Sequence, residues 1–557
     1  MKTVDYNGKS LVCKFYGDNF STNLNFIKSL AGASYDPKNR SWMLPITPKN
    51  NKLLMDDNWV FTKEALMLVA TKKEKIIDES ALDGLRPFQK EGVRFVENHN
   101  GHAIIGDECG LGKTIQAIGI AKLHPDKRFI IVCTASMKLK WAREIKKWTG
   151  KEAHIIYGEK DLQLPDSQFY IINYHILGRE DQESKKLELA RKKKAIDNEL
   201  PYKAEKIPVL GWWQRLVDIH PYGIFPDESH RLSDDKAIWT RSFIAMVKSS
   251  NPEILVPLSG TPIRKRPALF FTILNLVNEN MFPNKYKYLY KFCDPKHNGF
   301  GWQFMGASNV SELHELLQNV MIRRLKEDVA KELPPKEIIS IPLELDSLEE
   351  KHYWDANDQF VSFLNSAVVN TVVVKKHLSA LKQLAYIAKR NAAFRWIDEF
   401  IEDNDKLVIF GWHKLVISDL MDRYGKISVK VDGSVSGKDR QTAEDRFQID
   451  PTIKLFIGQI DAGGEGLTLT SANTVAFVEF PDTPGQFFQA ADRVHRIGQT
   501  ADVVYVYSLF AEGTIENHIV DGLEESYKNL KNILDGVDSP GIFTQSFDDV
   551  ILKGLRR

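Results

Sequence analysis

Apolar runs alternate with helical stretches in two separate regions of the chain, and this alternation constrains the fold more than any other feature. Residues 80–275 carry the runs HAIIG, FIIVC, FYIIN, YGIF and ILVPLSG. Residues 401–535 carry LVIFG, ISVKVDG, IKLFIG, VAFVEF and VVYVYSL. Strands that are buried on both faces and separated by crossover helices form parallel sheets. The pattern therefore predicts an α/β fold with two parallel-sheet domains.

The rest of the chain divides by its pattern of apolar residues. Residues 1–75 hold short alternating apolar stretches around one expected helix at 20–31, which indicates a small α+β module. Residues 276–400 have a mainly helical pattern, which indicates helical insertions and a connector. Residues 536–557 show little periodicity and are expected to form a C-terminal tail.

A charged stretch interrupts the first α/β region. Residues 178–207 are helical in pattern and are expected to form a solvated insertion between two strands. The lysine-rich part, KKLELARKKK at 185–194, is consistent with a contact to a nucleic-acid backbone. Such a run is more often the solvated face of a helix.

Composition narrows the class of protein. The 557 residues suggest three or four domains, and 75 Lys and Arg nearly balance 74 Asp and Glu, so any nucleic-acid surface must be a local patch. The four cysteines form no CxxC pair, which argues against a zinc finger or a disulfide framework and indicates a reducing compartment. No signal-peptide core and no run of about 18 apolar residues is present, so we expect an intracellular protein without a membrane span.

The strongest local motif is DECGLGKT, Asp107 to Thr114, between an apolar run and a helical run. Strand, glycine-rich turn and helix are the context of a phosphate-binding loop. Gly110 and Gly112 would let backbone N–H groups approach phosphates, Lys113 would reach the β- and γ-phosphates, and Thr114 would ligate Mg²⁺. The strict pattern begins with glycine, whereas this chain has Asp107. The alternative is a surface turn that contains GKT by chance.

The second motif is DESH, Asp227 to His230, after the run IHPYGIF. Asp227 would hold Mg²⁺ through water, and Glu228 would act as the general base on the attacking water. An N-cap formed by Asp227 or Ser229 is the structural alternative. Pro226 lacks a backbone donor and is expected to end the strand one residue early.

The third motif lies in GQFFQAADRVHRIGQ, at 485–499. Arg493 and Arg496 are three residues apart and would share a helical face. Two arginines aimed at a γ-phosphate from another domain would stabilise the charge that develops in the transition state, as arginine fingers do. The alternative is a solvated arginine pair near the end of a helix.

Nine blocks in this order resemble the Swi/Snf family of superfamily-two helicases over nearly all of the chain after residue 80. The resemblance implies two RecA-like domains, DNA-dependent ATP hydrolysis, and ATP and Mg²⁺ as cofactors. The chain departs from the family's pattern at Thr134, where proline is usual, and at Arg264 and Lys265, where asparagine is common after GTPI. The blocks are LRPFQKEGVRF (85–95), DECGLGKTIQAI (107–118), MKLKWAREIKKW (137–148), DESH (227–230), LSGTPI (258–263), MIRRLKEDVAKELPPK (321–336), VDGSVSGKDRQTAEDRF (431–447), DAGGEGLTLTSANTV (461–475) and QAADRVHRIGQ (489–499).

The same resemblance assigns further site residues. Arg86 and Gln89 fall in the segment that reads the adenine, with Gln89 as the base contact. Ser259 and Thr261 lie in the segment that couples the nucleotide site to nucleic acid. Gly464, Glu465 and Gly466 complete the nucleotide-binding set.

DESH in place of DEAH, and the stretch GASNVSELHELLQNVMIRR at 306–324, resemble the annealing-helicase and fork-remodelling group. Residues 11–46, particularly YDPKNRSWMLP at 35–45, resemble the HARP domain of that group. Tyr35, Arg40 and Trp42 beside Lys38 would suit unpaired or junction nucleic acid. The structural alternative is that the rings belong to the core of the module and DPKNR forms a turn.

These features together predict a DNA-dependent ATPase that moves along duplex DNA and remodels branched DNA by fork regression, branch migration or strand annealing. The expected partners are duplex and branched DNA, bound by a monomer that is associated with DNA in the cell. One alternative is the motor subunit of a larger remodelling or defence complex, although no nuclease or methylase motif is found. Another is an ATP-gated clamp that binds DNA without stepping. An RNA helicase fits the blocks less well.

Overall fold

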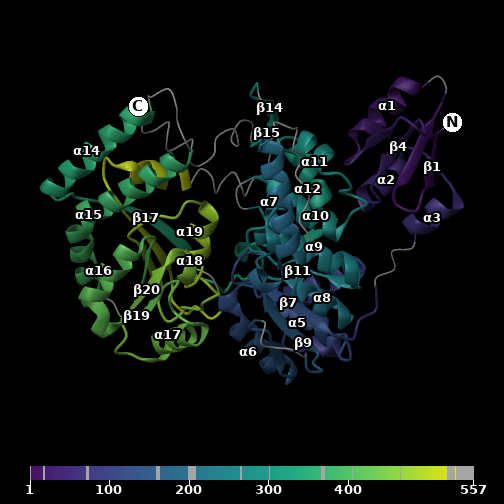
Figure 1. Ribbon diagram of the computed structural model, residues 1–557. Helices are drawn as coiled ribbons and strands as arrows, with labels where there is room; N and C mark the ends of the chain where they lie inside the picture. Colours follow the sequence, from purple (N-terminus) through teal and green to yellow (C-terminus); the bar gives the residue numbers. More distant parts are fainter. Residues whose placement is uncertain are drawn as a thin grey trace. The chain divides into compact units, whose positions relative to one another are not determined.

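The chain forms two compact units in the computed structural model (Figure 1). The first contains Met1–Asp107 and Gly112–Arg323, and the second contains Glu108–Leu111 and Arg324–Asn532. The structure describes residues 2–16, 19–70, 75–158, 164–197, 209–263, 266–299, 301–364, 371–403, 406–464, 466–523 and 534. Several positions singled out in the sequence lie outside the described residues: Arg264, Lys265, Glu465, the end of the expected insertion at 198–207, and the tail 536–557.

The N-terminal module is a five-stranded sheet with three helices. Its strand order is β3-β4-β2-β1-β5, and every pairing is antiparallel except that of β1 with β5. Val4, Leu11, Ile27 and Leu54 are fully buried in its core. The elements are β1 (Lys2–Tyr6), β2 (Leu11–Phe15), α1 (Phe20–Ser29), β3 (Ser34–Asp36), β4 (Ser41–Leu44), α2 (Pro48–Asp56), β5 (Val60–Phe61) and α3 (Lys63–Ala70).

The rest of the first unit is built on a parallel five-stranded sheet of order β13-β12-β7-β9-β8. Every residue of β7, β9 and β12 is buried, because helices cover such a sheet on both faces. The elements are α4 (Pro87–Asn98), β6 (Ile104–Ile105), α5 (Lys113–Lys122), β7 (Phe129–Cys133), α6 (Lys138–Thr149), β8 (Ala153–Ile155), β9 (Phe169–Asn173), β12 (Gly223–Pro226), α9 (Ile238–Ser250) and β13 (Ile254–Leu255).

Two groups of elements are inserted around this sheet. The expected insertion contains α7 (Gln182–Asp197), whose described lysines are exposed. The elements around it are β10 (Arg179–Glu180), β11 (Val209–Leu210) and α8 (Trp212–Asp218). The second group is α10 (Phe271–Val277), α11 (Lys285–Phe292), β14 (Pro295–His297), β15 (Trp302–Phe304), α12 (Val310–Leu317) and β16 (Met321–Ile322).

The second unit contains a six-stranded parallel sheet of order β17-β22-β21-β18-β20-β19. The sequence pattern missed β17, which falls in the stretch 276–400 that was expected to be mainly helical. Four of the eight residues of β17 are exposed and only one is buried, so the strand lacks a strong apolar signature, and its pairing comes from β22, far along the chain. The elements are α13 (Lys326–Val329), β17 (Lys336–Leu343), α14 (Ser347–Leu364), α15 (Thr371–Asp403), β18 (Leu407–Gly411), α16 (Lys414–Tyr424), β19 (Ser428–Val431), α17 (Gly437–Ile449), β20 (Leu455–Gln459), α18 (Ile460–Gly463), β21 (Thr474–Phe477), α19 (Pro484–Ala491) and β22 (Val504–Ala511).

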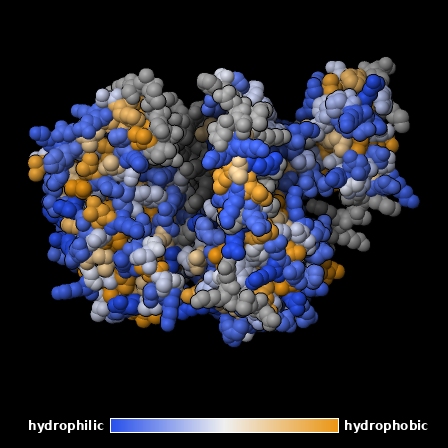
Figure 2. All heavy atoms as spheres, viewed as in Figure 1, coloured by the Kyte–Doolittle hydropathy of each residue, from blue (hydrophilic) through white to orange (hydrophobic). Residues whose placement is uncertain are grey.

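Polar residues cover most of the face shown in Figure 2, with apolar residues scattered among them. The large apolar side chains of each unit gather instead around its sheet. Among the helices that the structure describes, none combines the length and apolarity that a bilayer span requires.

A buried ion pair fastens α15 to the end of β22. Lys389 Nζ lies 2.5 Å from Glu516 Oε2 and donates to the carbonyl of Leu509. The same carboxylate accepts from the backbone N–H of Ala511 at 2.7 Å. Burial lowers the pKa of Lys389 and raises the pKa of Glu516, so each charge depends on the other.

Replacing Lys389 by Met should lower the free energy of unfolding by about 3–5 kcal/mol, because Glu516 would then be a buried charge without its partner. The exposed pair of Arg423 and Asp398 is the matched control, and Arg423→Met should cost at most about 1 kcal/mol. Adding Glu516→Leu to Lys389→Met should recover most of the loss. Urea titrations of the variants measure these differences, and equal losses for Lys389→Met and Arg423→Met would contradict the role given to burial.

Candidate nucleotide site

The loop between β6 and α5 has the backbone of a glycine turn. Gly110 has φ +96° and Gly112 has φ +80°, a region that L-residues rarely adopt. A Cβ atom on Gly112 would lie only 2.5 Å from Nε2 of Gln89. Gly112 is also the N-cap of α5, so the first N–H groups of that helix face the loop. Sequence and backbone therefore fit a phosphate-binding turn.

Gln89 and Arg86, the residues expected at the adenine, meet at the start of α4. The Gln89 side chain accepts a hydrogen bond from the backbone N–H of Arg86 at 3.0 Å. Gln89 is 3% exposed and lies against Gly112. The Gln89 side chain therefore joins the beginning of α4 to the glycine turn.

Asp107, the departure from the strict motif, is a structural part of the loop. Its carboxylate accepts from Nε2 of Gln116 at 2.8 Å, and its backbone carbonyl accepts from Nζ of Lys113 at 2.8 Å. Asp107 is fully buried. The aspartate thus fixes α5 and orients Lys113, while Thr114 lies half-buried in the first turn of that helix.

Asp227 is held by the sheet and by two aromatic residues. Its backbone N–H donates to Val132 at 2.8 Å, and Trp141 Nε1 donates to its carboxylate at 2.8 Å. The Tyr174 hydroxyl donates to its carbonyl at 2.6 Å. Burial and then the charge of Asp227 raise the pKa of Tyr174 well above its usual value, which keeps the hydroxyl protonated.

Pro226 does not end the strand early. It is the last residue of β12, and its carbonyl accepts from Leu258 at 2.9 Å. The ladder continues through Asp227, which is bridged to Leu258. The missing N–H is tolerated because the neighbouring groups keep their partners on both sides of the strand.

Glu228 has a strained backbone, with φ +48° and ψ +49°. It occupies the N-cap of the short 3₁₀ helix Ser229–Ser233, so neither Asp227 nor Ser229 is the N-cap residue, and the Glu228 side chain forms no capping hydrogen bond. Glu228 Oε2 lies 3.3 Å from His230 Nδ1. The observed turn directs the Glu228 carboxylate to the histidine of the same motif.

The acidic pair is connected to the segment LSGTPI. His230 Nδ1 lies 3.0 Å from the Ser259 hydroxyl, which accepts from the backbone N–H of Thr261 at 3.2 Å. Ser259 is fully buried, at the centre of this group of polar contacts. The Thr261 hydroxyl is buried and has no hydrogen-bond partner in the described part of the chain. A polar path therefore runs from Glu228 to Thr261.

Arg493 and Arg496 lie in the second unit, just after α19. They do not share a helical face as expected, because α19 ends at Ala491 and the arginines follow in turns. Arg493 Nε donates to the Gln489 carbonyl at 2.9 Å, and Arg496 Nε donates to the Asp492 carbonyl at 3.1 Å.

These arginines are not a solvated pair. Arg493 is 2% exposed. Burial, and then the charge of Arg493, lower the pKa of Arg496 to about 10. Two guanidinium groups held close together under these conditions would be stabilised by a bound anion.

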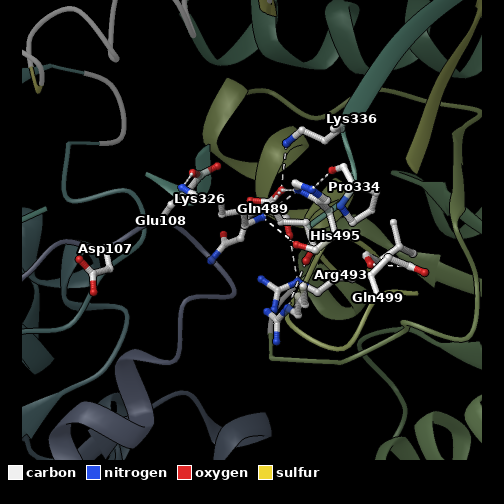
Figure 3. Close-up of polar contacts among 12 residues, drawn as sticks. Asp107, Glu108, Lys326, Pro334, Lys336, Gln489, Arg493, His495 and Gln499 are labelled. Carbon is white, nitrogen blue, oxygen red and sulfur yellow. Dashed lines mark hydrogen bonds and ion pairs between the residues drawn. The ribbon is translucent and has the colours of Figure 1, made fainter. Parts of the chain in front are cut away.

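Figure 3 shows Lys326, Lys336 and His495 in a network of polar contacts near Arg493. The carboxylate of this network, that of Asp492, was not singled out from the sequence. Asp492 Oδ1 lies 2.9 Å from Lys326 Nζ and 3.0 Å from Lys336 Nζ. Lys326 also donates to the His495 carbonyl at 2.8 Å, and His495 Nε2 donates to the Pro334 carbonyl at 2.9 Å. Burial alone would raise the pKa of Asp492, but the two lysines outweigh burial and hold that pKa well below its usual range.

The same network reaches the residues Glu108–Leu111, which group with the second unit. The backbone N–H of Lys326 donates to the Glu108 carboxylate at 2.8 Å, and the N–H of Glu108 donates to the Arg324 carbonyl at 3.0 Å. The only signal for Lys326 and Lys336 in the sequence was their position inside the block 321–336. Their shared carboxylate lies more than 150 residues away and could not be paired with them by pattern.

Two further glycines have a backbone reason for their identity. A Cβ on Gly464 would lie 2.3 Å from the carbonyl oxygen of Ile460, and Gly466 has φ +75°. Both positions, which the resemblance assigned to the nucleotide site, therefore require glycine.

The nucleic-acid residues expected in the N-terminal module lie on one hairpin. Tyr35 and Trp42 pair across β3 and β4 with ring centroids 5.5 Å apart. Tyr35 is 47% exposed, whereas Trp42 is half-buried against the module core. Lys38 and Arg40 are exposed in the turn, which Asp36 stabilises by accepting from the Lys38 N–H at 3.0 Å. The structural alternative is thus correct for the turn and partly correct for Trp42.

The donor set fits a nucleotide with Mg²⁺. A glycine turn, an ammonium, a hydroxyl and a buried carboxylate are the groups that bind polyphosphate and a hard cation. Among the described residues, no cluster of three or more His, Cys, Asp or Glu could hold a metal by itself. Mg²⁺ that relies on phosphates and water for most of its ligands needs no such cluster.

Comparison with known proteins agrees with the motif order. Residues 88–392 match the model of the SNF2-related domain, and residues 392–498 match the helicase conserved C-terminal domain. The chain is 27% identical, over 95% of its length and 51% of the relative, to the "SWI/SNF-related matrix-associated actin-dependent regulator of chromatin subfamily A-like protein 1" of Xenopus laevis. It is 30% identical to the homolog from Caenorhabditis elegans, over 89% of this chain and 70% of that protein.

The human "DNA annealing helicase and endonuclease ZRANB3" is 32% identical over 78% of this chain and 39% of that protein. The chain thus spans about half the length, or less, of the first curated relatives that it matches. The resemblance inferred from the motif blocks and the predicted α/β fold are confirmed. The chain belongs to the SNF2-related family.

Proposed function

We propose that the chain is a DNA-dependent ATPase that moves along duplex DNA and remodels branched DNA, by fork regression, branch migration or strand annealing. The observation that carries the proposal is the polar path from the acidic pair to Thr261, next to a glycine turn built for phosphates. The name of one relative describes annealing activity, which agrees with this proposal. Such a protein would be associated with DNA in the cell.

In the proposed reaction, Lys113 binds the β- and γ-phosphates, and Gln89 with Arg86 contacts the adenine. Mg²⁺ bound near Thr114 and Asp227 would neutralise charge on the phosphates. Glu228 takes the proton of the attacking water. The strained turn at Glu228 supports that role, because the Glu228 side chain does not cap the helix that follows.

Arg493 and Arg496 are proposed to stabilise the charge that develops on the γ-phosphate. Their burial and the lowered pKa of Arg496 favour an anion as their partner. The Asp492 carboxylate pairs with both Lys326 and Lys336 and so fixes the backbone from which the arginines extend.

The hairpin of the N-terminal module is proposed to hold unpaired bases at a branch point. The exposed ring of Tyr35 beside the exposed Lys38 and Arg40 suits stacking next to a phosphate chain. The module also packs on α12, where the N–H of Gly32 donates to Glu312 at 2.6 Å. We also propose that this module is HARP-like.

The proposed function is tested by ATPase rates measured side by side on single-stranded, duplex, forked and four-way DNA. We expect stimulation by duplex and a further increase on branched DNA. A chain that DNA does not stimulate would refute the proposal. Displacement of a triplex strand then separates a stepping motor from an ATP-gated clamp, because a clamp would hydrolyse ATP without displacing the strand.

Lys113→Ala should retain less than about a tenth of the DNA-stimulated ATPase, a loss above about 1.4 kcal/mol of transition-state stabilisation. DNA binding should remain, because Lys113 faces the phosphates. Lys122→Ala, at the other end of α5, is the matched control and should keep normal turnover.

Glu228→Gln should bind ATP but stall before hydrolysis, and wild-type turnover in that variant would exclude Glu228 as the base.

Arg493→Ala and Arg496→Ala should each lower kcat by about 10³-fold, with a much smaller change in ATP affinity. The exposed Arg446, in the last turn of α17, provides a control that should be silent. Single-turnover hydrolysis and nucleotide binding measured together separate the two effects. If ATP binding falls as steeply as kcat, the arginines serve binding or folding rather than the transition state.

Deleting residues 1–75 should leave ATPase on long duplex DNA nearly unchanged, because the residues of the nucleotide site begin at Arg86. Fork regression or annealing should fall sharply. Trp42→Ala should weaken fork binding by about 1–3 kcal/mol if its ring stacks on a base. A thermal melt distinguishes lost stacking from lost folding, since Trp42 also packs on the module core. Full fork remodelling by the truncated chain would remove the role proposed for the module.

A further inference from the structure

The hairpin of β14 and β15 lies outside both parallel sheets and packs its rings against α11. Tyr290, on α11, contacts Trp302 and Phe304 with ring centroids 5.1 and 5.2 Å apart. His297 contacts Trp302 across the hairpin at 5.4 Å. In Figure 1 the hairpin is well separated from β7 and β9 of the same unit. The aromatic group is therefore no part of the core around the sheet.

These rings are open to solvent. Trp302 is 52% exposed and Tyr290 is 42% exposed, and Tyr286, one helical turn before Tyr290, is 71% exposed. The tip of the hairpin projects into open space, because a Cβ atom on Gly299 or Gly301 would meet no atom within 4 Å. A folded chain gains nothing from aromatic faces left in water, whereas a partner that covers them gains their burial.

Lysines surround the rings. Residues 284–305 contain four lysines and one aspartate. Lys285 pairs with Asp235, Lys291 pairs with Glu312 and Lys296 pairs with Asp294, but Lys287 is exposed and forms no ion pair with any residue that the structure describes. These side chains thus combine stacking rings with positive charge. We call them the α11 hairpin surface, which consists of Tyr286, Lys287, Tyr290, Lys296, His297 and Trp302.

A protein partner fits this surface less well than a nucleic acid. Lysine is depleted in protein interfaces, because burying its charge is costly. Phosphates, in contrast, attract lysine, and bases stack on exposed aromatic rings in any sequence. Bases inside a duplex already stack on one another, so the rings are matched to unpaired nucleotides.

We propose that the α11 hairpin surface binds single-stranded DNA, with Trp302 and Tyr290 stacking on bases and Lys287 beside the backbone. The proposal rests on the proposed function in one respect, namely that the chain acts on branched DNA, where unpaired nucleotides arise. It adds a second contact for such nucleotides, in the first unit but outside the N-terminal module.

The test uses the full chain and a fluorescent oligothymidine, with binding followed by anisotropy. Trp302→Ala and Lys287→Glu should each weaken binding, and the loss for Trp302→Ala should be about 5- to 150-fold. Trp302→Phe should restore most of the affinity, because it keeps a ring to stack. Duplex-stimulated ATPase should stay at the wild-type rate in all three variants.

Two variants serve as matched controls. Trp354→Ala removes a 39% exposed tryptophan that also has an edge contact with a tyrosine, and Lys248→Glu reverses an exposed lysine at the end of α9. Both should bind oligothymidine like the wild type. Equal losses in the controls, or wild-type binding by both Trp302→Ala and Lys287→Glu, would overturn the proposal. If no DNA stimulates ATPase in the wild type, the motor function fails, while the binding measurement still decides the role of this surface.

Discussion

Asp227 is held through its backbone by the parallel sheet and through its side chain by Trp141, and the first half of the site depends on that attachment. Because β12 keeps its hydrogen bonds through Pro226, the acidic pair leaves the sheet at a fixed point. The turn at Glu228 and the contact of His230 with Ser259 both follow from that point. A shift of β12 by one residue would move all of these groups together, whereas a change in one surface loop would not.

In the second unit, several cationic side chains are largely shielded from water. Lys326 and Lys336 share the Asp492 carboxylate, and Arg493 lies buried next to it in sequence. Removing this carboxylate would leave the buried ammonium group of Lys326 and the partly buried one of Lys336 without their shared partner, which costs more than the pair itself contributes. The network therefore fixes the backbone conformation after Ala491, where the helical hydrogen bonds of α19 have ended.

The two parallel sheets and the glycine loop could be predicted because each leaves a local pattern: buried apolar runs, glycine spacing, and a helix that follows at once. The partners of Asp492 could not, since Lys326 and Lys336 are distant in sequence and look like ordinary surface lysines. The edge strand β17 was missed for a related reason, because its partner β22 lies far along the chain. The burial of Ser259 and the end of α19 before Arg493 depend on packing that no short window of sequence contains.

The conformation of Glu228 also bears on how this protein can evolve or be engineered. A left-handed backbone costs a residue with a Cβ on the order of 1 kcal/mol or more, and glycine or asparagine at the same position would relieve that strain. Selection for heat resistance alone would therefore favour the loss of this carboxylate. If variants selected for thermal stability accumulate glycine at position 228, they will have gained stability by losing the Glu228 carboxylate and its proposed role in hydrolysis.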